Sequence, residues 1–137
     1  MPHGIYLVTT TTHQRSPLFT DFWAGVTVSG CFADASLLGD AHLMAWVLMP
    51  DHVHWMLQLG ESMGLGEAVN RLKSASARRL NRRMGQQGTI WARAFHDRAL
   101  RREDDLKVMA RYLVANPVRA GLVERVGDYP FWDAVWL

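Results

Sequence analysis

Two apolar stretches separated by a two-residue break constrain the fold of this chain more than any other feature. Residues 41–49 are apolar on both faces, as in a central strand, although a buried helix has the same pattern. The break at Pro50-Asp51 and the short length of the stretch favour the strand. Because residues 52–59 follow almost at once, we expect the two stretches to pair as an antiparallel hairpin.

The second of these strands carries two histidines on one face. Side chains alternate between the faces of a strand, so His52 and His54 point to one side and Val53, Trp55 and Leu57 to the other. A one-residue slip in the pairing would turn the histidines over. Such a pair can bind a metal ion, but it also occurs as ordinary polar residues on an amphipathic strand.

The remaining elements complete a mixed fold. Their order is strand, helix, two strands, helix, strand and helix, over residues 4–12, 18–32, 41–49, 52–59, 67–84, 89–100 and 103–116. Pro117 is expected to end the last helix, and the aromatic tail should dock on the core. This order predicts an α+β fold, a ferredoxin-like split βαβ domain with an antiparallel sheet packed by helices, plus a C-terminal extension.

Length and cysteine content indicate a single small domain inside the cell. At 137 residues, we expect one domain over residues 1–137. The lone Cys31 cannot form an internal disulfide, which fits a reducing cytoplasm. The N-terminus does not read as a signal peptide, and the longest apolar run, residues 43–49, is too short to span a bilayer. We therefore expect a soluble, cytoplasmic protein.

Positive charge is concentrated in the predicted helix 67–84. This segment has six cations and one acid, a net charge of +5, whereas the whole chain has a formal net charge of +2. The six cations are Arg71, Lys73, Arg78, Arg79, Arg82 and Arg83. A solvated helix face commonly has this composition, and a surface that binds nucleic acid is the functional alternative.

A second group of candidate residues lies on the last predicted helix. Tyr112 and Asn116 are four residues apart and should share a face of that helix. Two imidazoles and an amide oxygen can hold a divalent cation that acts as a Lewis acid. A phenol can then attack a phosphodiester that the cation polarises. The ordinary alternatives are a tyrosine with a buried ring and an asparagine that ends a helix before proline.

Two motifs, in this order and at this separation, resemble a known family. Residues 49–55 read MPDHVHW, and residues 111–123 read RYLVANPVRAGLV. With them, the chain resembles the single-tyrosine transposases of the HUH superfamily, specifically the REP-associated tyrosine transposase branch. The resemblance covers nearly the whole length and implies a ferredoxin-like catalytic domain.

The resemblance implies a role for each candidate residue. His52 and His54 would bind Mg²⁺ or Mn²⁺, Asn116 would be the third ligand and Tyr112 the nucleophile. The implied substrate is single-stranded DNA next to an imperfect palindromic hairpin, cut and rejoined through a 5′-phosphotyrosine bond. The basic residues expected to contact DNA phosphates are Arg15, Arg71, Lys73, Arg78, Arg79 and Arg82.

The expected partner is hairpin-bearing DNA and not a membrane, with the protein acting as a monomer or a homodimer. The alternative is a non-catalytic regulator, derived from such a transposase, that only binds DNA hairpins. A protein that only binds has no chemical need for His52, His54 and Tyr112 together, so their presence favours the enzyme.

Overall fold

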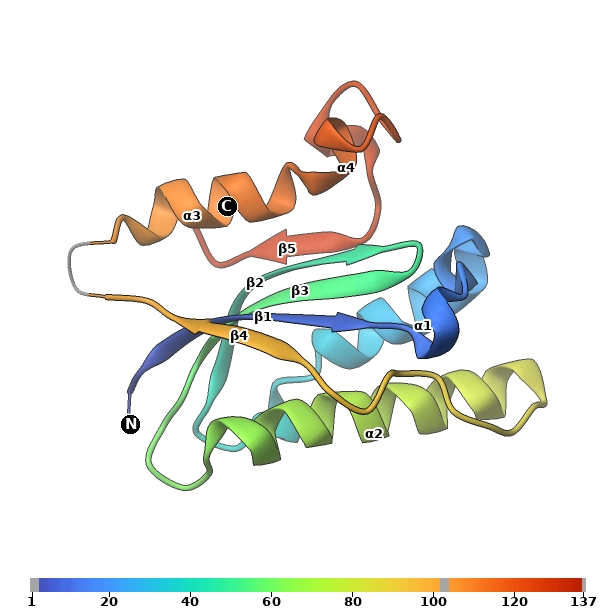
Figure 1. The fold of residues 1–137 in the computed structure, drawn as a ribbon, viewed down its shortest axis with the longest axis horizontal. Coiled ribbons are helices and arrows are strands. Elements are labelled where there is room, and N and C mark those ends of the chain that lie inside the picture. The colour runs from blue at the N-terminus through green and yellow to red at the C-terminus, as the bar shows by residue number, and fades with distance from the viewer. Residues whose placement is uncertain (1–2, 102–103, 137) are drawn as a thin grey trace.

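The computed structural model describes residues 3–101 and 104–136, and it contains a five-stranded antiparallel sheet with helices on both faces (Figure 1). The strand order is β4-β1-β3-β2-β5. The strands are β1 (Ile5–Thr11), β2 (His42–Met49), β3 (His52–Gln58), β4 (His96–Ala99) and β5 (Trp132–Ala134). The first four follow the ferredoxin-like order and β5 extends the sheet. The predicted α+β fold with a C-terminal extension is confirmed.

Helices cover the two faces of the sheet in pairs. On one face lie α1 (Phe22–Phe32) and α2 (Leu65–Met84), and on the other lie α3 (Leu106–Val114) and α4 (Asn116–Arg119). Asp21 and Asp105 cap α1 and α3 by accepting backbone N–H groups, and Gly85 ends α2 in the left-handed conformation at φ 61°. Within the described residues, no helix is both long and apolar enough to cross a bilayer.

The β2–β3 hairpin forms in the register that the sequence favours. Met49 pairs with His52 and Val47 with His54, and the histidines share the face covered by α3 and α4. On the opposite face, Val53 and Trp55 are fully buried. The ring of Trp55 meets the ring of Phe32 on α1 edge to face, with centroids 5.5 Å apart. The apolar side of β3 therefore anchors the strand and turns the imidazoles toward α3.

The strand expected over residues 89–100 is wrong in its first half. Only His96–Ala99 forms β4, and Trp91 makes an isolated bridge with Thr12. Backbone hydrogen bonds of Ile90 and Ala92 still join this segment to the end of β1, and a bend at Arg93 separates it from β4. The side chain of Trp91 is buried, and its Nε1 donates a hydrogen bond to Oγ of Ser76 on α2 at 2.9 Å.

Two helix boundaries also differ from the expectation. A 3₁₀ turn over Leu18–Thr20 precedes α1, which starts only after the cap at Asp21. Pro117 does not end the helical backbone. It lies in the first turn of α4, where its missing N–H costs no hydrogen bond, and the break comes at Ala115. Glu103, the first residue of the helix expected over residues 103–116, lies outside the described residues.

The aromatic tail docks on the core, as expected. β5 pairs with the edge of β2, and Phe131 just before it is buried against α1. There it meets Phe22, with ring centroids 5.8 Å apart, and it covers the backbone of Gly25. The C-terminal segment thus closes the α1 side of the fold.

Gly25→Ala is expected to destabilise the fold by about 1–3 kcal/mol, because a Cβ there would lie 2.3 Å from ring atoms of Phe131. Gly30 on the same helix is the matched control, since a Cβ there meets nothing within 4 Å. Gly30→Ala should raise the free energy of unfolding by about 0.5–1 kcal/mol. Urea unfolding of both variants tests this, and a Gly25→Ala protein as stable as wild type would contradict the packing.

Candidate functional site

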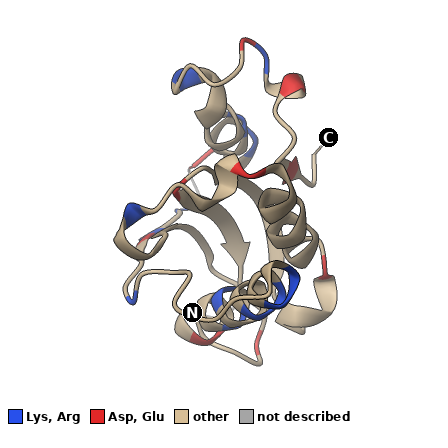
Figure 2. Ribbon diagram, turned by 90° about the vertical axis from the view of Figure 1, so that its right-hand side faces the viewer, with Lys and Arg blue, Asp and Glu red and all other residues tan. Residues whose placement is uncertain are grey.

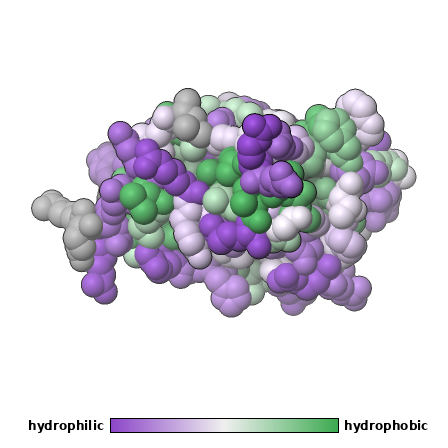
Figure 3. All heavy atoms as spheres, turned by 90° about the horizontal axis from the view of Figure 1, so that it is seen from above, coloured by the Kyte–Doolittle hydropathy of each residue, from purple (hydrophilic) through white to green (hydrophobic). Residues whose placement is uncertain are grey.

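A cavity of about 450 Å³ is lined by residues of the sheet and of helices α3 and α4. Its lining includes His54 from β3, Tyr112 from α3 and Asn116 from α4. On this side of the molecule, apolar surface lies among hydrophilic side chains (Figure 3). His52 does not line the cavity itself, but its ring lies against that of His54, with centroids 4.8 Å apart. The sheet and the last helices therefore bring the four sequence-predicted residues into one region.

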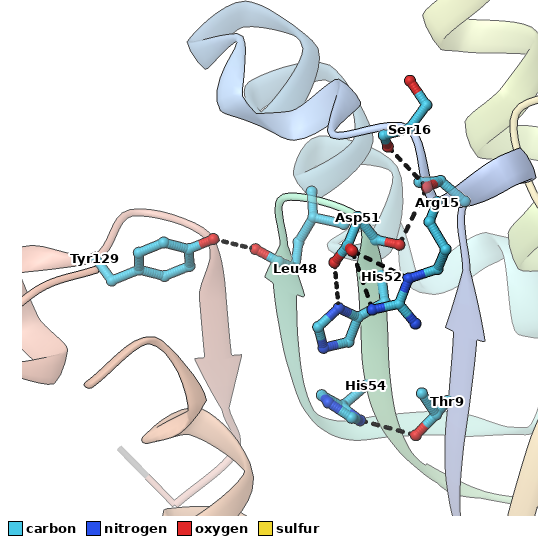
Figure 4. Close-up of polar contacts among 9 residues, drawn as sticks. Thr9, Arg15, Ser16, Leu48, Asp51, His52, His54 and Tyr129 are labelled. Atoms are coloured by element: carbon cyan, nitrogen blue, oxygen red, sulfur yellow. Dashed lines mark hydrogen bonds and ion pairs between the residues drawn. The ribbon is translucent and has the colours of Figure 1, made fainter. Parts of the chain in front are cut away.

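Both imidazoles are oriented through the same ring atom (Figure 4). Nδ1 of His52 donates a hydrogen bond to Oδ1 of Asp51 at 2.7 Å, and Nδ1 of His54 is hydrogen-bonded to Oγ1 of Thr9 at 2.8 Å. Thr9 reaches His54 because the two residues are direct partners across the β1–β3 ladder. Both Nε2 atoms are left without a hydrogen-bond partner in the described part of the chain, which is the arrangement expected of metal-ligating histidines.

The surroundings of His54 and Asp51 shift the pKa of each side chain. Burial, with smaller effects of the charges of His52 and Arg119, lowers the pKa of His54 to about 4. Its ring is therefore neutral at pH 7, the form that can bind a metal. Burial alone would raise the pKa of Asp51, but the hydrogen bond and charge of His52, together with Arg15, outweigh it and leave that pKa below its usual value.

Arg15 belongs to this network. Its Nη2 and Nε atoms lie 3.0 and 3.1 Å from Oδ2 of Asp51, whose other oxygen holds His52. Figure 4 shows the three side chains joined in that order. Arg15 was expected to contact DNA phosphates. In the structure it lies beside the candidate metal ligands and pairs with the carboxylate of Asp51.

Tyr112 and Asn116 present their functional atoms differently. The side chain of Tyr112 is 67% exposed, and Cζ of Arg119 lies 3.7 Å from the centroid of its ring. Nδ2 of Asn116 donates to the carbonyl of Leu113 at 2.6 Å, so Oδ1 is the atom left to bind a cation. The kink at Ala115 places the two residues on successive helices, yet both line the cavity.

The donor atoms fit a divalent cation. Imidazole nitrogens are common ligands of transition-metal ions, and an amide oxygen is of the type that Mg²⁺ and Mn²⁺ prefer, so two Nε2 atoms and one amide oxygen can hold a divalent cation without selecting one metal. Among the described residues, no group of three or more His, Cys, Asp or Glu could hold a metal ion. A cation held by His52 and His54 would therefore take its further ligands from other groups, among which the amide oxygen of Asn116 lines the neighbouring cavity.

The basic residues of α2 lie on the other face of the sheet from the cavity (Figures 1 and 2). Three of them already have partners within the chain. Arg79 pairs with Asp34 at 2.8 Å, Arg71 pairs with Glu67 at 3.3 Å, and Nζ of Lys73 donates to the carbonyl of Arg93. Arg78 and Arg82 form no ion pair with a described residue. DNA contact by these α2 residues stays a prediction.

Sequence reasoning missed further residues of this region. Thr9 becomes a partner of His54 only through the strand register, which no local pattern reveals. In the sequence, Asp51 is accounted for by the break between the two strands, and only the structure shows its carboxylate holding His52. Arg98 reaches the cavity from the edge strand β4. Arg119 did leave a signal, because it lies seven residues after Tyr112, which is two helical turns along the same face.

The chain matches the family model described as Transposase IS200 like over residues 3–116. It is 32% identical over 98 residues to a protein of Haemophilus influenzae described as a REP-associated tyrosine transposase, covering 64% of this chain and 56% of that protein. It is 31% identical over 87 residues to the REP-associated tyrosine transposase of Escherichia coli K12, covering 64% and 50%. The chain thus spans about half the length of these relatives.

A solved structure has the same fold. It is described as a REP-associated tyrosine transposase bound to a REP hairpin, and it superposes with a TM-score of 0.74 at 24% sequence identity. The match covers 96% of this chain and 77% of that one.

Proposed function

This chain belongs to the family of IS200-like transposases, and from that premise we propose that it is a metal-dependent transposase that cuts and rejoins single-stranded DNA next to palindromic hairpins. The observation that carries the proposal is the cavity that Tyr112, His54 and Asn116 line together, with His52 against His54. The hairpin as partner is supported by the relative of the same fold, which is described as bound to a REP hairpin.

The reaction would be a transesterification at one phosphodiester. Oη of Tyr112 attacks the phosphorus and forms a bond to it, while the bond from phosphorus to the 3′ oxygen of the preceding nucleotide breaks. The phenol loses its proton and the departing 3′ oxygen gains one, so the products are a 5′-phosphotyrosine ester and a free 3′ hydroxyl. Rejoining is the reverse attack by a 3′ hydroxyl. No oxidant or further co-reactant is consumed.

The residues that would hold Mg²⁺ or Mn²⁺ are His52, His54 and Asn116. The bound cation would supply Lewis-acid polarisation of the phosphate oxygens. Asp51 and Thr9 fix the two imidazoles with Nε2 free. The exposure of Tyr112 leaves its hydroxyl open to a DNA strand. One chain brings Tyr112 and His54 onto the same cavity, so the proposal needs no exchange of helices between two copies.

Asp51→Ala is expected to weaken Mn²⁺ binding by about 10-fold or more, because it removes the carboxylate that orients His52. Isothermal titration calorimetry with Mn²⁺ measures the effect. Asp128→Ala is the matched control, since Asp128 forms an exposed ion pair with Arg125 and does not line the cavity. Equal Mn²⁺ affinity in wild type and a folded Asp51→Ala protein would contradict this role.

The proposal is tested by looking for a covalent adduct. The protein is incubated with Mg²⁺ or Mn²⁺ and end-labelled hairpins taken from palindromic repeats that flank its gene, and the products are separated on a denaturing gel. A labelled band at the mass of protein plus DNA is the expected result. Binding of these hairpins without any adduct would reject the enzyme and favour the hairpin-binding regulator.

A further inference from the structure

Two arginines line the cavity beside Tyr112. Arg98 comes from β4 and Arg119 from the end of α4, and the described lining residues include neither Asp nor Glu. Nη2 of Arg98 reaches the thioether of Met109 at 3.9 Å, which is a weak acceptor. Arg119 forms no ion pair with a described residue. Among the described residues, no carboxylate therefore pairs with either arginine, and an anion entering the cavity would meet both positive charges.

The position of Arg119 allows it to contact two groups at once. Its Cζ lies 3.7 Å from the centroid of the Tyr112 ring, so the guanidinium covers a face of the phenol. The five N–H donors of a guanidinium point outward in its own plane, so stacking by the face leaves the edge able to bind an anion. Because Arg119 also lines the cavity, a phosphate held at that edge would lie next to the phenol.

We propose that Arg119 and Arg98 form a phosphodiester site in this cavity, and that Arg119 binds the phosphate to be cleaved while holding the Tyr112 ring beside it. This deepens the proposed function and rests on it, because the bound phosphate is the one that Tyr112 attacks. A guanidinium binds phosphate oxygens through two parallel hydrogen bonds, which fixes the orientation of the phosphate as well as its position.

This site differs from the phosphate contacts expected from the sequence. Those residues were Arg15 and the cations of α2, yet Arg15 is paired with Asp51 and α2 lies behind the sheet. Contacts on α2 would attach DNA without placing any particular phosphate near Tyr112. Arg119 and Arg98 are on the side where Tyr112 and His54 lie, so they carry the positioning of the reacting group.

The first test measures binding without metal. In EDTA, the anisotropy of a labelled hairpin with a single-stranded extension is compared with that of variants in which each phosphate in turn is a neutral methylphosphonate. Wild type should lose about 10-fold in affinity at one position. The Arg119→Gln protein should bind the unmodified hairpin more weakly than wild type does. A methylphosphonate at that position should not weaken its binding further, because the substitution and the methylphosphonate remove the same contact.

Arg111→Gln is the matched control for the loss of one positive charge. Arg111 is exposed on α3, next to Tyr112 in sequence, and it does not line the cavity. Like wild type, Arg111→Gln should lose affinity for the hairpin when the methylphosphonate is at that one position. The proposal would be overturned if a methylphosphonate at each position weakened hairpin binding by Arg119→Gln as much as it weakens binding by wild type.

The second test separates positioning from binding. At saturating hairpin with metal, Arg119→Gln should lower the single-turnover rate of adduct formation by about 100-fold, and Arg119→Lys should recover part of it. Equal rates in wild type and Arg119→Gln would overturn the positioning role. Equal thermal unfolding of the variants excludes a fold defect as the cause. If wild type forms no adduct at all, the proposed transposase reaction fails, while the binding test in EDTA still decides the phosphate site.

Discussion

Tyr112→Phe is expected to abolish the covalent protein–DNA adduct while leaving hairpin binding nearly unchanged. The variant lacks only Oη, the atom that would become bonded to phosphorus, and no other group replaces it as nucleophile. The side chain is largely exposed, so its hydroxyl supports no buried packing. The phenylalanine ring still offers a face on which Arg119 can stack. The loss should therefore appear in the chemical step alone.

The measurement combines a denaturing gel for the adduct with anisotropy for binding of the same labelled hairpin. Tyr6→Phe is the matched control, because Tyr6 lies on β1 and does not line the cavity. This variant should form the adduct as wild type does. Normal cleavage by Tyr112→Phe would show that another residue is the nucleophile.

The sheet could be predicted from the sequence because its signals are local. The Pro50-Asp51 break fixed the hairpin, and the alternation of His52, Val53 and His54 fixed which side faces α3. The inward stripe of α2 was also readable, since Val69 and Leu72 recur at helical spacing and both are buried. Where partners far along the chain decide, as β1 does for the interrupted pairing between Trp91 and His96, the local pattern misled.

The candidate site was only partly predictable for the same reason. Spacing alone grouped Tyr112 with Asn116, and the sheet and helices place both at the cavity with His54. The support of the His54 imidazole by Thr9 depends on strand register, which the sequence does not state. The basic character of α2 was evident, but its position behind the sheet follows from topology alone. Of the two arginines of the cavity, Arg119 is spaced seven residues from Tyr112, whereas Arg98 reaches the cavity only through the pairing of β4 with β1.

His54→Ala is expected to remove both Mn²⁺ binding and metal-dependent adduct formation. Of the two imidazoles, His54 is the one that lines the cavity with Tyr112 and Asn116, and Thr9 holds its Nε2 atom free. A metal site with one imidazole and one amide oxygen has too few protein ligands to bind tightly at neutral pH. His52→Ala should have the same effect, since it removes the partner ring 4.8 Å away.

Calorimetry with Mn²⁺ and the yield of adduct across a Mn²⁺ titration measure the two losses separately. His42→Ala is the matched control, because His42 is exposed at the start of β2 and does not line the cavity of Tyr112. Hairpin binding in EDTA should survive in all three variants, since the phosphate contacts come from arginines. Adduct formation at the wild-type level in both His52→Ala and His54→Ala would rule out the metal site, and the phosphate polarisation would then have to come from Arg98 and Arg119.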